Sequence, residues 1–304
     1  MYSLSTCWNS SRHTDGRAML REIRELGFEY AELSHGIRIS LLPGVFEAVD
    51  AGEIRISSLH NFCPLPIGVN HAAPNIFKFT SLDTRERENA YRYSVKTIET
   101  AARVKAPVVV LHLGCIEMKD YTDKLIALVE AGLRESPKFE KLCAEAISKR
   151  EARKEKHVQL ANEMVLRLAD HAQRLGVRLG VENREAVEEI PLEEDFPWFF
   201  QELNHPAIGY WHDTGHAQIK ENLGFMNHVI HMENLAHRLL GCHIHDVQFP
   251  ARDHCPPGTG VIDFASLRPF IQSHHLRILE MSPGVEAEEI RQGLLHLKSI
   301  WGET

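Results

Sequence analysis

Short apolar runs alternate with longer segments of helical periodicity along almost the whole chain. Runs such as 108–111 (VVVL) and 177–181 (VRLGV) contain few polar residues. This is typical of parallel strands that are buried on both faces. The segments between them, such as 16–26, repeat apolar residues every three or four positions, as an amphipathic helix does. Strands that alternate with helices predict an α/β fold with a parallel sheet.

The pattern contains eight strand-like runs, each followed by helix-forming sequence. The expected strands are 2–6, 28–34, 54–60, 107–113, 177–182, 208–212, 240–247 and 276–280. The expected helices are 16–26, 42–51, 83–106, 196–203, 225–239, 265–273 and 286–301. Eight strand–helix units predict a (β/α)8 barrel, or TIM barrel, and we expect residues 1–304 to form one such domain.

Two kinds of segment interrupt this repeat. The stretch 119–176 is almost wholly helix-forming and too long for one crossover, so we expect a helical insertion between strands four and five, at about residues 119–160. Its charged run, 147–158, is expected to form a solvated helix face, because Glu residues alternate with Lys and Arg at pair-forming spacing. The long loops 61–81 and 249–260 are rich in proline and are expected to shape a pocket.

Charge, apolar runs and cysteine spacing argue against a nucleic-acid-binding, membrane-spanning or disulfide-rich protein. The formal charge of the 304 residues is −8, so no overall positive field attracts nucleic acid, and a nucleic-acid partner is not expected. No apolar run approaches the roughly 20 residues of a membrane span, and the first residues lack a signal-peptide pattern. The six cysteines form no Cys-x-x-Cys pair, which indicates reduced thiols. We therefore expect a soluble cytoplasmic protein.

Acidic and imidazole side chains follow most of the predicted strands. The candidates outside strand seven are His60, His112, Glu182, Asp213 and Glu280. In a parallel barrel all these strand ends meet on one face, and such oxygen and nitrogen donors suit a divalent metal ion. Strand seven offers His243 and His245, between which spacing cannot choose, because residues two apart on a strand share a face.

Each candidate has a structural alternative. Glu182 and Glu280 could form buried ion pairs with a neighbouring arginine such as Arg184, because a carboxylate is costly to bury alone. Asp213 and His216 could belong to a helix-capping turn. His254 could bind a second metal ion or the substrate, or be a solvent-exposed loop residue. Arg184 and Arg252, near the predicted mouth, could recognise a substrate carboxylate or phosphate.

Five strings carry a resemblance to a known family: LGVENRE, GYWHDTGHA, GCHIHDV, DHCPPGTGVID and ILEMSP. In this order and at these intervals they resemble the xylose isomerase-like TIM-barrel superfamily, also called AP endonuclease family 2. That superfamily includes sugar-phosphate isomerases and epimerases, ketose 3-epimerases, dehydroshikimate dehydratases and endonuclease IV. The resemblance covers the barrel and leaves 119–176 outside.

The resemblance implies a metal site. In the ketose 3-epimerase branch, one ion of manganese, cobalt or magnesium is held at the positions that match Glu182, Asp213, His243 and Glu280. This pattern favours His243 over His245. The same branch implies that His216 contacts the substrate.

The endonuclease IV branch implies a larger centre. Its three-zinc cluster has further histidines that match His60, His112, His216 and His254. This chain departs from that branch at Arg252, where the branch has an aspartate, and Asp253 is shifted by one position. We expect one divalent ion (Mn, Co, Mg or Zn), with up to three if the second branch applies.

These observations predict a metal-dependent isomerase or epimerase of a small sugar, sugar phosphate or keto-acid. Glu182 and Glu280 would transfer a proton through a metal-stabilised enediolate. The alternatives are a multi-zinc phosphodiesterase of the endonuclease IV type, a dehydratase or lyase on the same scaffold, and a non-catalytic binding barrel. The expected ligand is a polyhydroxy carbonyl compound. The sequence does not decide the oligomeric state, for which a homodimer is one hypothesis because barrels of this kind often pair.

Overall fold

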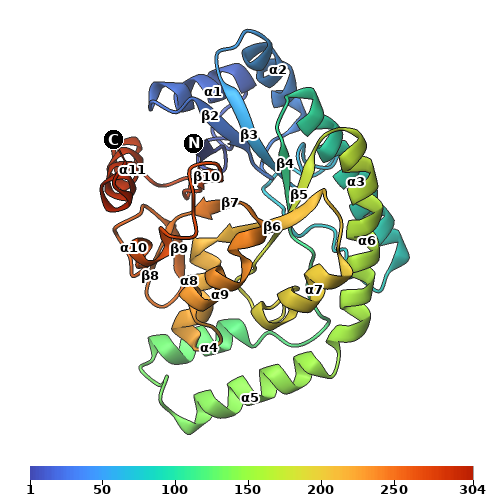
Figure 1. The fold of residues 1–304 in the computed structure, drawn as a ribbon, viewed down its shortest axis with the longest axis vertical. Coiled ribbons are helices and arrows are strands. Elements are labelled where there is room, and N and C mark those ends of the chain that lie inside the picture. Colours follow the sequence, from blue (N-terminus) through green and yellow to red (C-terminus); the bar gives the residue numbers. More distant parts are fainter. Residues whose placement is uncertain (304) are drawn as a thin grey trace.

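The strands form a closed parallel barrel in the computed structural model, which describes residues 1–303 (Figure 1). Within these residues the eight barrel strands follow the order β1-β10-β7-β6-β5-β4-β3-β2. They are β1 (Tyr2–Ser5), β2 (Tyr30–Leu33), β3 (Arg55–His60), β4 (Val108–Leu111), β5 (Arg178–Glu182), β6 (Ile208–Asp213), β7 (Leu239–Ile244) and β10 (Leu276–Leu279). The predicted TIM barrel is confirmed.

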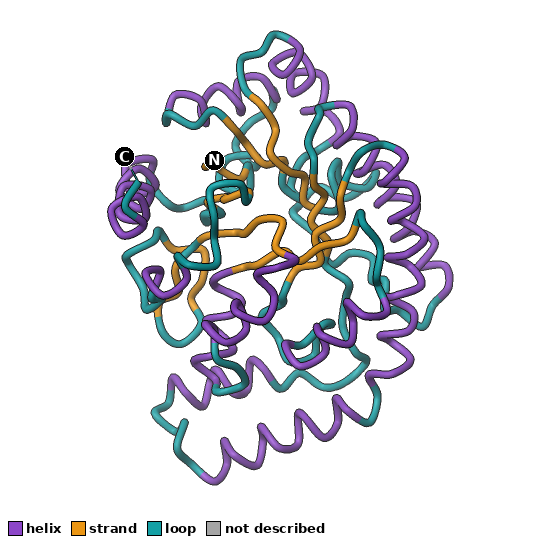
Figure 2. Tube along the Cα trace, in the orientation of Figure 1, coloured by secondary structure: helices purple, strands orange, loops and turns teal. Residues whose placement is uncertain are grey.

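Helices cover the outside of the barrel (Figure 2). They are α1 (Gly16–Glu25), α2 (Leu42–Asp50), α3 (Thr84–Arg103), α6 (Lys154–Arg174), α7 (Phe196–Glu202), α8 (Thr214–Leu223), α9 (His228–Leu235), α10 (Phe264–Leu267) and α11 (Ala287–Trp301). Aspartate caps begin four of them: Asp15 accepts from the Ala18 N–H, Asp83 from the Arg85 N–H, Asp213 from the His216 N–H and Asp263 from the Ala265 N–H. Among residues 1–303, no helix has the length and apolar content that crossing a membrane requires.

The predicted insertion is present between β4 and β5. It contains α4 (Thr122–Glu130) and α5 (Pro137–Glu151), which lie outside the ring of barrel helices in Figure 1. The next helix, α6, packs against α3 and β5 and so serves as the ordinary barrel helix of this unit. The extra chain therefore comprises α4 and α5.

The greatest differences from the predicted elements follow β6 and β7. The helix expected over 225–239 is present but shorter, as α9, and an additional helix, α8, precedes it. Helix α8 is buried on almost every side, polar residues included, so it has no apolar stripe to reveal it. The loop expected over 249–260 contains β9 (Arg252–Cys255), which pairs antiparallel with β8 (Asp246–Gln248). The helix expected over 265–273 is reduced to α10.

The expectation of a solvated face over 147–158 is wrong for Arg150. Its side chain is fully buried, and it donates hydrogen bonds to the carbonyl oxygens of Val187 and Glu189, both at 2.8 Å. It also forms an ion pair with Asp195, which Lys154 contacts at 2.8 Å. Arg150 thus ties α5 to the loop after β5. Its partners lie 37 to 45 residues away in sequence, beyond the reach of local spacing rules.

We predict that Arg150→Met lowers the free energy of unfolding by about 3–5 kcal/mol, because it removes one of the two cations that contact the buried carboxylate of Asp195. Urea unfolding at pH 7 measures this loss. Lys149→Met, at an exposed position of the same helix, is the matched control and should change the value by less than about 0.5 kcal/mol. Equal effects of the two substitutions would contradict the buried-pair account.

The same pair predicts a pH dependence. Burial alone would raise the pKa of Asp195, but Arg150 and Lys154 hold it below its ordinary value of 3.8. A carboxyl group whose pKa is lower in the folded state stabilises the fold above that ordinary value, and this stabilisation is lost as the pH falls through the folded pKa. The stability difference between wild type and Asp195→Asn should therefore shrink below about pH 4. A difference that stays constant down to pH 2 would oppose this assignment.

Candidate metal centre

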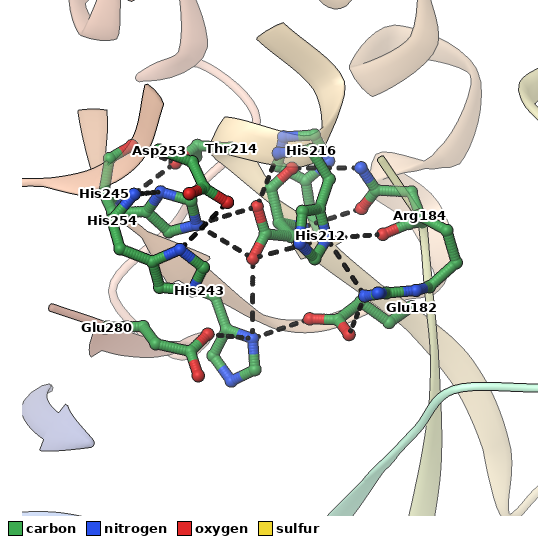
Figure 3. A network of polar contacts seen from close by, with 12 residues as sticks. Glu182, Arg184, His212, Thr214, His216, His243, His245, Asp253, His254 and Glu280 are labelled. Carbon is green, nitrogen blue, oxygen red and sulfur yellow. Dashed lines mark hydrogen bonds and ion pairs between the residues drawn. The ribbon is translucent and has the colours of Figure 1, made fainter. Parts of the chain in front are cut away.

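Four side chains from consecutive strand ends meet inside the mouth of the barrel (Figure 3). Glu182, Asp213 and His243 belong to β5, β6 and β7, and Glu280 follows β10 directly. All four are at most 4% exposed. The Nδ1 atom of His243 lies 2.6 Å from Glu182 Oε1, 3.0 Å from Glu280 Oε2 and 3.8 Å from Asp213 Oδ2. The four predicted metal ligands therefore lie together around one point.

The orientation of His243 is set by Glu32, a buried carboxylate on β2. The Nε2 atom of His243 lies 3.0 Å from Glu32 Oε2, which accepts its proton. In the neutral ring this leaves Nδ1 unprotonated and facing Glu182, Asp213 and Glu280. Burial alone would lower the pKa of His243, but the surrounding carboxylates of Glu280, Glu32 and Glu182 raise it well above its ordinary value. The site thus binds either a proton or another cation at this position.

Sequence reasoning missed Glu32. The residue is fully buried, and the hydroxyls of Ser5 and Ser58 donate to its two carboxylate oxygens at 2.9 and 2.7 Å. The sequence feature that could have indicated Glu32 is its position in a short strand, Tyr30–Leu33, whose other residues are suited to burial. A carboxylate in such a position needs hydrogen-bond donors or a cation nearby, as the strand-end carboxylates do.

Asp213 caps a helix and also faces the predicted metal position. Its Oδ1 accepts the His216 backbone N–H at 2.8 Å and so caps α8, while Oδ2 faces His243. Asn183, next to Glu182, fixes the backbone of Asp213 from both sides: its side chain accepts from the Asp213 N–H at 2.7 Å and donates to the Asp213 carbonyl at 3.0 Å. The cap orients the carboxylate toward the centre, so the two roles support one another.

The geometry separates His243 from His245. Both rings are buried, but the Nδ1 atom of His245 accepts the backbone N–H of His254 at 2.9 Å. Its Nε2–H then donates to Asp213 Oδ1 at 3.0 Å. Both nitrogens of His245 are therefore used by the protein, whereas Nδ1 of His243 faces carboxylate oxygens only. The arrangement favours His243 as the ligand and makes His245 a support for Asp213.

Gly215 of the GYWHDTGH string allows this support. A Cβ atom at this position would lie 2.0 Å from Cε1 of His245, far inside any normal contact. Thr214 completes the junction, because its hydroxyl donates to the His245 carbonyl at 2.8 Å and accepts the His245 N–H at 3.1 Å. The start of α8 is thus fitted closely to the end of β7.

A second group of donors adjoins the first. His60 Nε2 lies 3.0 Å from His112 Nε2, and Glu182 Oε2 lies 2.6 Å from His112 Nε2. Glu182 therefore directs one carboxylate oxygen to each group. Arg184 is also here: its Nη1 lies 2.7 Å from His112 Nε2, 3.2 Å from Glu182 Oε2 and 3.2 Å from His216 Nδ1. The ion pair between Glu182 and Arg184, given above as the structural alternative, is therefore present, and Glu182 contacts His112 and His243 as well.

The remaining predicted residues lie at the rim. His254 stacks on His245 with ring centroids 4.2 Å apart, and its Nδ1 lies 2.9 Å from Asp253 Oδ2. Burial alone would lower the pKa of His254, but the pair with Asp253 raises it to about 9. Arg252 is exposed and contacts Gln248 on the neighbouring strand, so the structure does not bring it to the centre.

A cavity of about 340 Å³ opens beside Glu280 and His254. Its other walls come from the loops after β1, β2 and β3 and carry polar groups, among them Ser10, Ser34 and His71. This volume and lining suit a small hydroxylated ligand. A larger cavity, about 440 Å³, lies at the opposite end of the barrel near Met1 and Leu276, away from all the strand-end ligands. In parallel barrels the chemistry resides at the C-terminal ends of the strands, so the smaller cavity is the relevant one.

The donors fit a divalent ion. Ligand atoms of Glu182, Asp213 and His243 all lie within 4.8 Å of one another, as do those of Glu32, His243 and Glu280, and those of His60, His112 and Glu182. An ion with bonds of about 2.0–2.2 Å holds its ligands at such spacing. Burial alone would raise the pKa of Glu182, yet His243 and His112 hold it well below its ordinary value, so the carboxylate is ionised as a metal ligand must be.

Comparison with known proteins is consistent with this architecture. The sequence model of the xylose isomerase-like TIM barrel family matches residues 20–300. No curated protein sequence matches the chain.

Solved structures match at low sequence identity. A putative xylose isomerase from Rhodospirillum rubrum has a TM-score of 0.73 and 16% identity over 100% of this chain and 99% of its own. A D-tagatose 3-epimerase-like protein has a TM-score of 0.69 and 17% identity over 99% and 97% of the two chains. The 3-keto-D-glucoside 4-epimerase from E. coli has a TM-score of 0.67 and 13% identity over 98% of each. At these identities the likeness shows the fold.

We predict that Gly215→Ala destabilises the protein by about 1–3 kcal/mol, because the added methyl group must displace the His245 ring. Thermal or urea unfolding measures the loss. Gly284→Ala is the control, since a Cβ there has nothing within 4 Å, and it should be near neutral. If Gly215→Ala is as stable as this control, the close fit between α8 and His245 is not a constraint on the fold.

Proposed function

This chain belongs to the xylose isomerase-like TIM barrel family, and we propose that it is a divalent-metal-dependent isomerase or epimerase of a small polyhydroxy carbonyl compound. The observation that carries the proposal is the convergence of Glu182 and Glu280 on the Nδ1 atom of His243, beside a cavity that Glu280 and His254 line. Structural neighbours titled as sugar epimerases support the same reaction class.

The proposed ligands of the ion are Glu182, Asp213, His243 and Glu280. When bound, a divalent ion would supply a Lewis acid that polarises the substrate carbonyl and stabilises negative charge on its oxygen. The donor set combines carboxylate oxygens with an imidazole nitrogen, and Mn, Co, Mg and Zn are the ions proposed for it. Glu32 orients His243, and Asn183 and His245 orient Asp213, so the donor set is arranged before the ion arrives.

The two glutamates are the proposed proton carriers. They arrive from β5 and β10 on different sides of His243, and Glu280 lines the cavity directly. One carboxylate would remove the proton from the carbon next to the carbonyl, and the other would return a proton. Return to the opposite face of the same carbon gives an epimer, and return to the neighbouring carbon gives an isomer. Loss of a β-hydroxyl instead gives dehydration, the chemistry of the dehydratase and lyase alternative.

The rim residues are proposed to hold the substrate. His216 contacts Arg184 and the Asn183 carbonyl, and His254 stands at the cavity wall as a cation, which suits an oxygen-rich ligand. Arg252 is exposed and contacts Gln248, so its proposed contact with the substrate rests on the sequence alone. The proposed ligand is a sugar, sugar phosphate or keto-acid. A cytoplasmic location stays a prediction from the sequence, and a homodimer stays a hypothesis.

A second candidate is a multi-zinc phosphodiesterase. The observation that favours it is the second donor group of His60, His112 and Glu182, beside His216 and His254. Against it stand the net charge of −8 and the position of Arg184 in that donor group. Nicking of abasic-site DNA by the zinc-loaded protein tests this candidate.

The first test is exchange of substrate protons with solvent deuterium. We predict that the manganese-loaded protein incorporates deuterium next to the carbonyl of a ketose or keto-acid in a panel read by NMR. Glu182→Gln and Glu280→Gln should each lower the rate by about 10²–10⁴-fold, because each removes a proton carrier. Glu202→Gln, at an exposed position after β5, is the matched control and should retain the wild-type rate.

Metal content is measured on every variant, so that loss of a ligand and loss of a proton carrier are distinguished. Absence of exchange with every carbonyl compound, together with nicking of abasic DNA, would overturn the isomerase proposal in favour of the second candidate.

A separate prediction concerns Glu32. We expect Glu32→Gln to lower the affinity for Mn²⁺ by about 10–100-fold, because the neutral amide adds no negative charge to the centre and is a weaker acceptor for the Nε2–H of His243. Isothermal titration calorimetry measures the affinity. Glu29→Gln, at an exposed position just before β2, is the control and should bind Mn²⁺ as the wild type does. An unchanged affinity for Mn²⁺ in Glu32→Gln would show that Glu32 does not support metal binding through His243.

A further inference from the structure

Arg184 is an unusual neighbour for a group of metal-binding side chains. Its side chain is only 4% exposed, and its guanidinium group contacts protein groups. Its Nε donates to Glu189 Oε1 at 3.0 Å, and Glu189 is held in turn by the Ala186 N–H at 3.1 Å. Nη1 is therefore fixed between Glu182 and His216, as Figure 3 shows, and it also contacts Nε2 of His112. A guanidinium group held in this way is not free to reach out for a substrate anion.

The group that Arg184 contacts is itself arranged as a metal site. We assign the Nδ1–H tautomer to His60, because Nδ1 lies 2.7 Å from the Asn61 carbonyl oxygen. We assign the same tautomer to His112, whose Nδ1 lies 3.0 Å from Asn75 Oδ1. Both rings then present the lone pair of Nε2, and these two atoms lie 3.0 Å apart.

The carboxylate of Glu182 completes the group, with Oε2 at 2.6 Å from His112 Nε2 and 3.7 Å from His60 Nε2. Three atoms that carry lone pairs therefore converge, out of contact with water. Such an arrangement is unfavourable unless a cation lies among them. Fixed tautomers and buried donors are the features that hold a metal ion in place.

Arg184 supplies the positive charge and uses the lone pair that an ion would need. An imidazole nitrogen has a single lone pair in the ring plane. The contact of 2.7 Å between Arg184 Nη1 and His112 Nε2 uses it, and a metal ion would require the same lone pair at about 2.0–2.1 Å. The second contact of Nη1, to Glu182 Oε2, covers the carboxylate oxygen that faces this second group. The two cations therefore exclude one another.

We propose that Arg184 is a built-in cation that takes the place of a second metal ion at His60, His112 and Glu182, and so limits the centre to one metal. The inference rests on the proposed metal-dependent function, because Glu182 is shared between the two positions. A guanidinium group neutralises Glu182 but cannot bind and activate a water molecule as a metal ion does. Arg184 thereby favours proton transfer on a carbonyl compound over multi-metal hydrolysis.

The test is the number of zinc ions bound per chain. Wild type, Arg184→Met and Arg184→Gln are loaded with Zn²⁺, freed of excess metal and measured by inductively coupled plasma mass spectrometry, with folding checked by circular dichroism. We expect one ion in the wild type and one more in each Arg184 variant. The matched double variant, Arg184→Met with His60→Gln, should return to the wild-type number, because it removes a ligand of the added ion.

Cobalt gives an independent readout, since binding of Co²⁺ to the added imidazole ligands changes its visible absorption. We expect this change in Arg184→Met and its loss when His60→Gln is added. An equal number of ions in wild type and the folded Arg184 variants would overturn the inference. So would a second ion in the wild type that His60→Gln removes, an outcome that decides the matter even if no Arg184 variant folds.

Different results would contradict the proposed metal-dependent function and the proposed role of Arg184. A wild type that binds no ion contradicts the proposed function, whereas the difference between wild type and the Arg184 variants still decides the role of Arg184. A wild type that binds one ion, with variants that gain none, leaves the metal-dependent function standing and removes only the inference.

Discussion

The buried negative charge at the mouth of the barrel is the constraint on which the rest of the site depends. Glu32, Glu182, Asp213 and Glu280 are at most 4% exposed and lie around the single ring of His243. Carboxylates taken out of water at this density are costly unless cations and hydrogen-bond donors surround them. Each structural detail near them supplies a donor, fixes a tautomer or leaves room for a positive charge.

Individual carboxylate groups in this site each make two different kinds of contact. Asp213 caps α8 with one oxygen and faces His243 with the other. Glu182 directs one oxygen to His243 and the other to His112 and Arg184. The site and the packing of the strand ends are therefore the same set of interactions. A change at Gly215, which is not itself a proposed ligand of the ion, still reaches Asp213 through His245.

Much of this architecture follows from local sequence signals. Apolar runs such as β4 and β5 predict buried parallel strands, and parallel strands in a barrel bring their C-terminal residues together, which is why the approximate location of Glu182, Asp213 and Glu280 could be predicted. Spacing alone could not choose between His243 and His245, because the two residues share one face of the strand. The family resemblance favoured His243, and the structure adds that the hydrogen-bond partners of the two rings differ.

Other features carry no local signal. Glu32 lies on β2, and its contact with His243 spans 211 residues of sequence. In the sequence, Arg150 is one member of a charged run that predicts an exposed helix face. In the fold, the loop after β5 covers its side chain and accepts its hydrogen bonds. Helix α8 is buried on nearly all sides, so its sequence lacks the periodicity from which helices are predicted. The contacts of Arg184 with two histidines depend on the closure of the whole barrel.

The central claim is that a divalent cation relieves the crowding of carboxylates around His243. The most direct measurement is an anomalous-difference map from crystals grown with Mn²⁺ and recorded on both sides of the manganese absorption edge. The account predicts one strong peak within bonding distance of Glu182, Asp213, His243 and Glu280. A map without a peak at that position, in crystals saturated with Mn²⁺ at neutral pH, would contradict it.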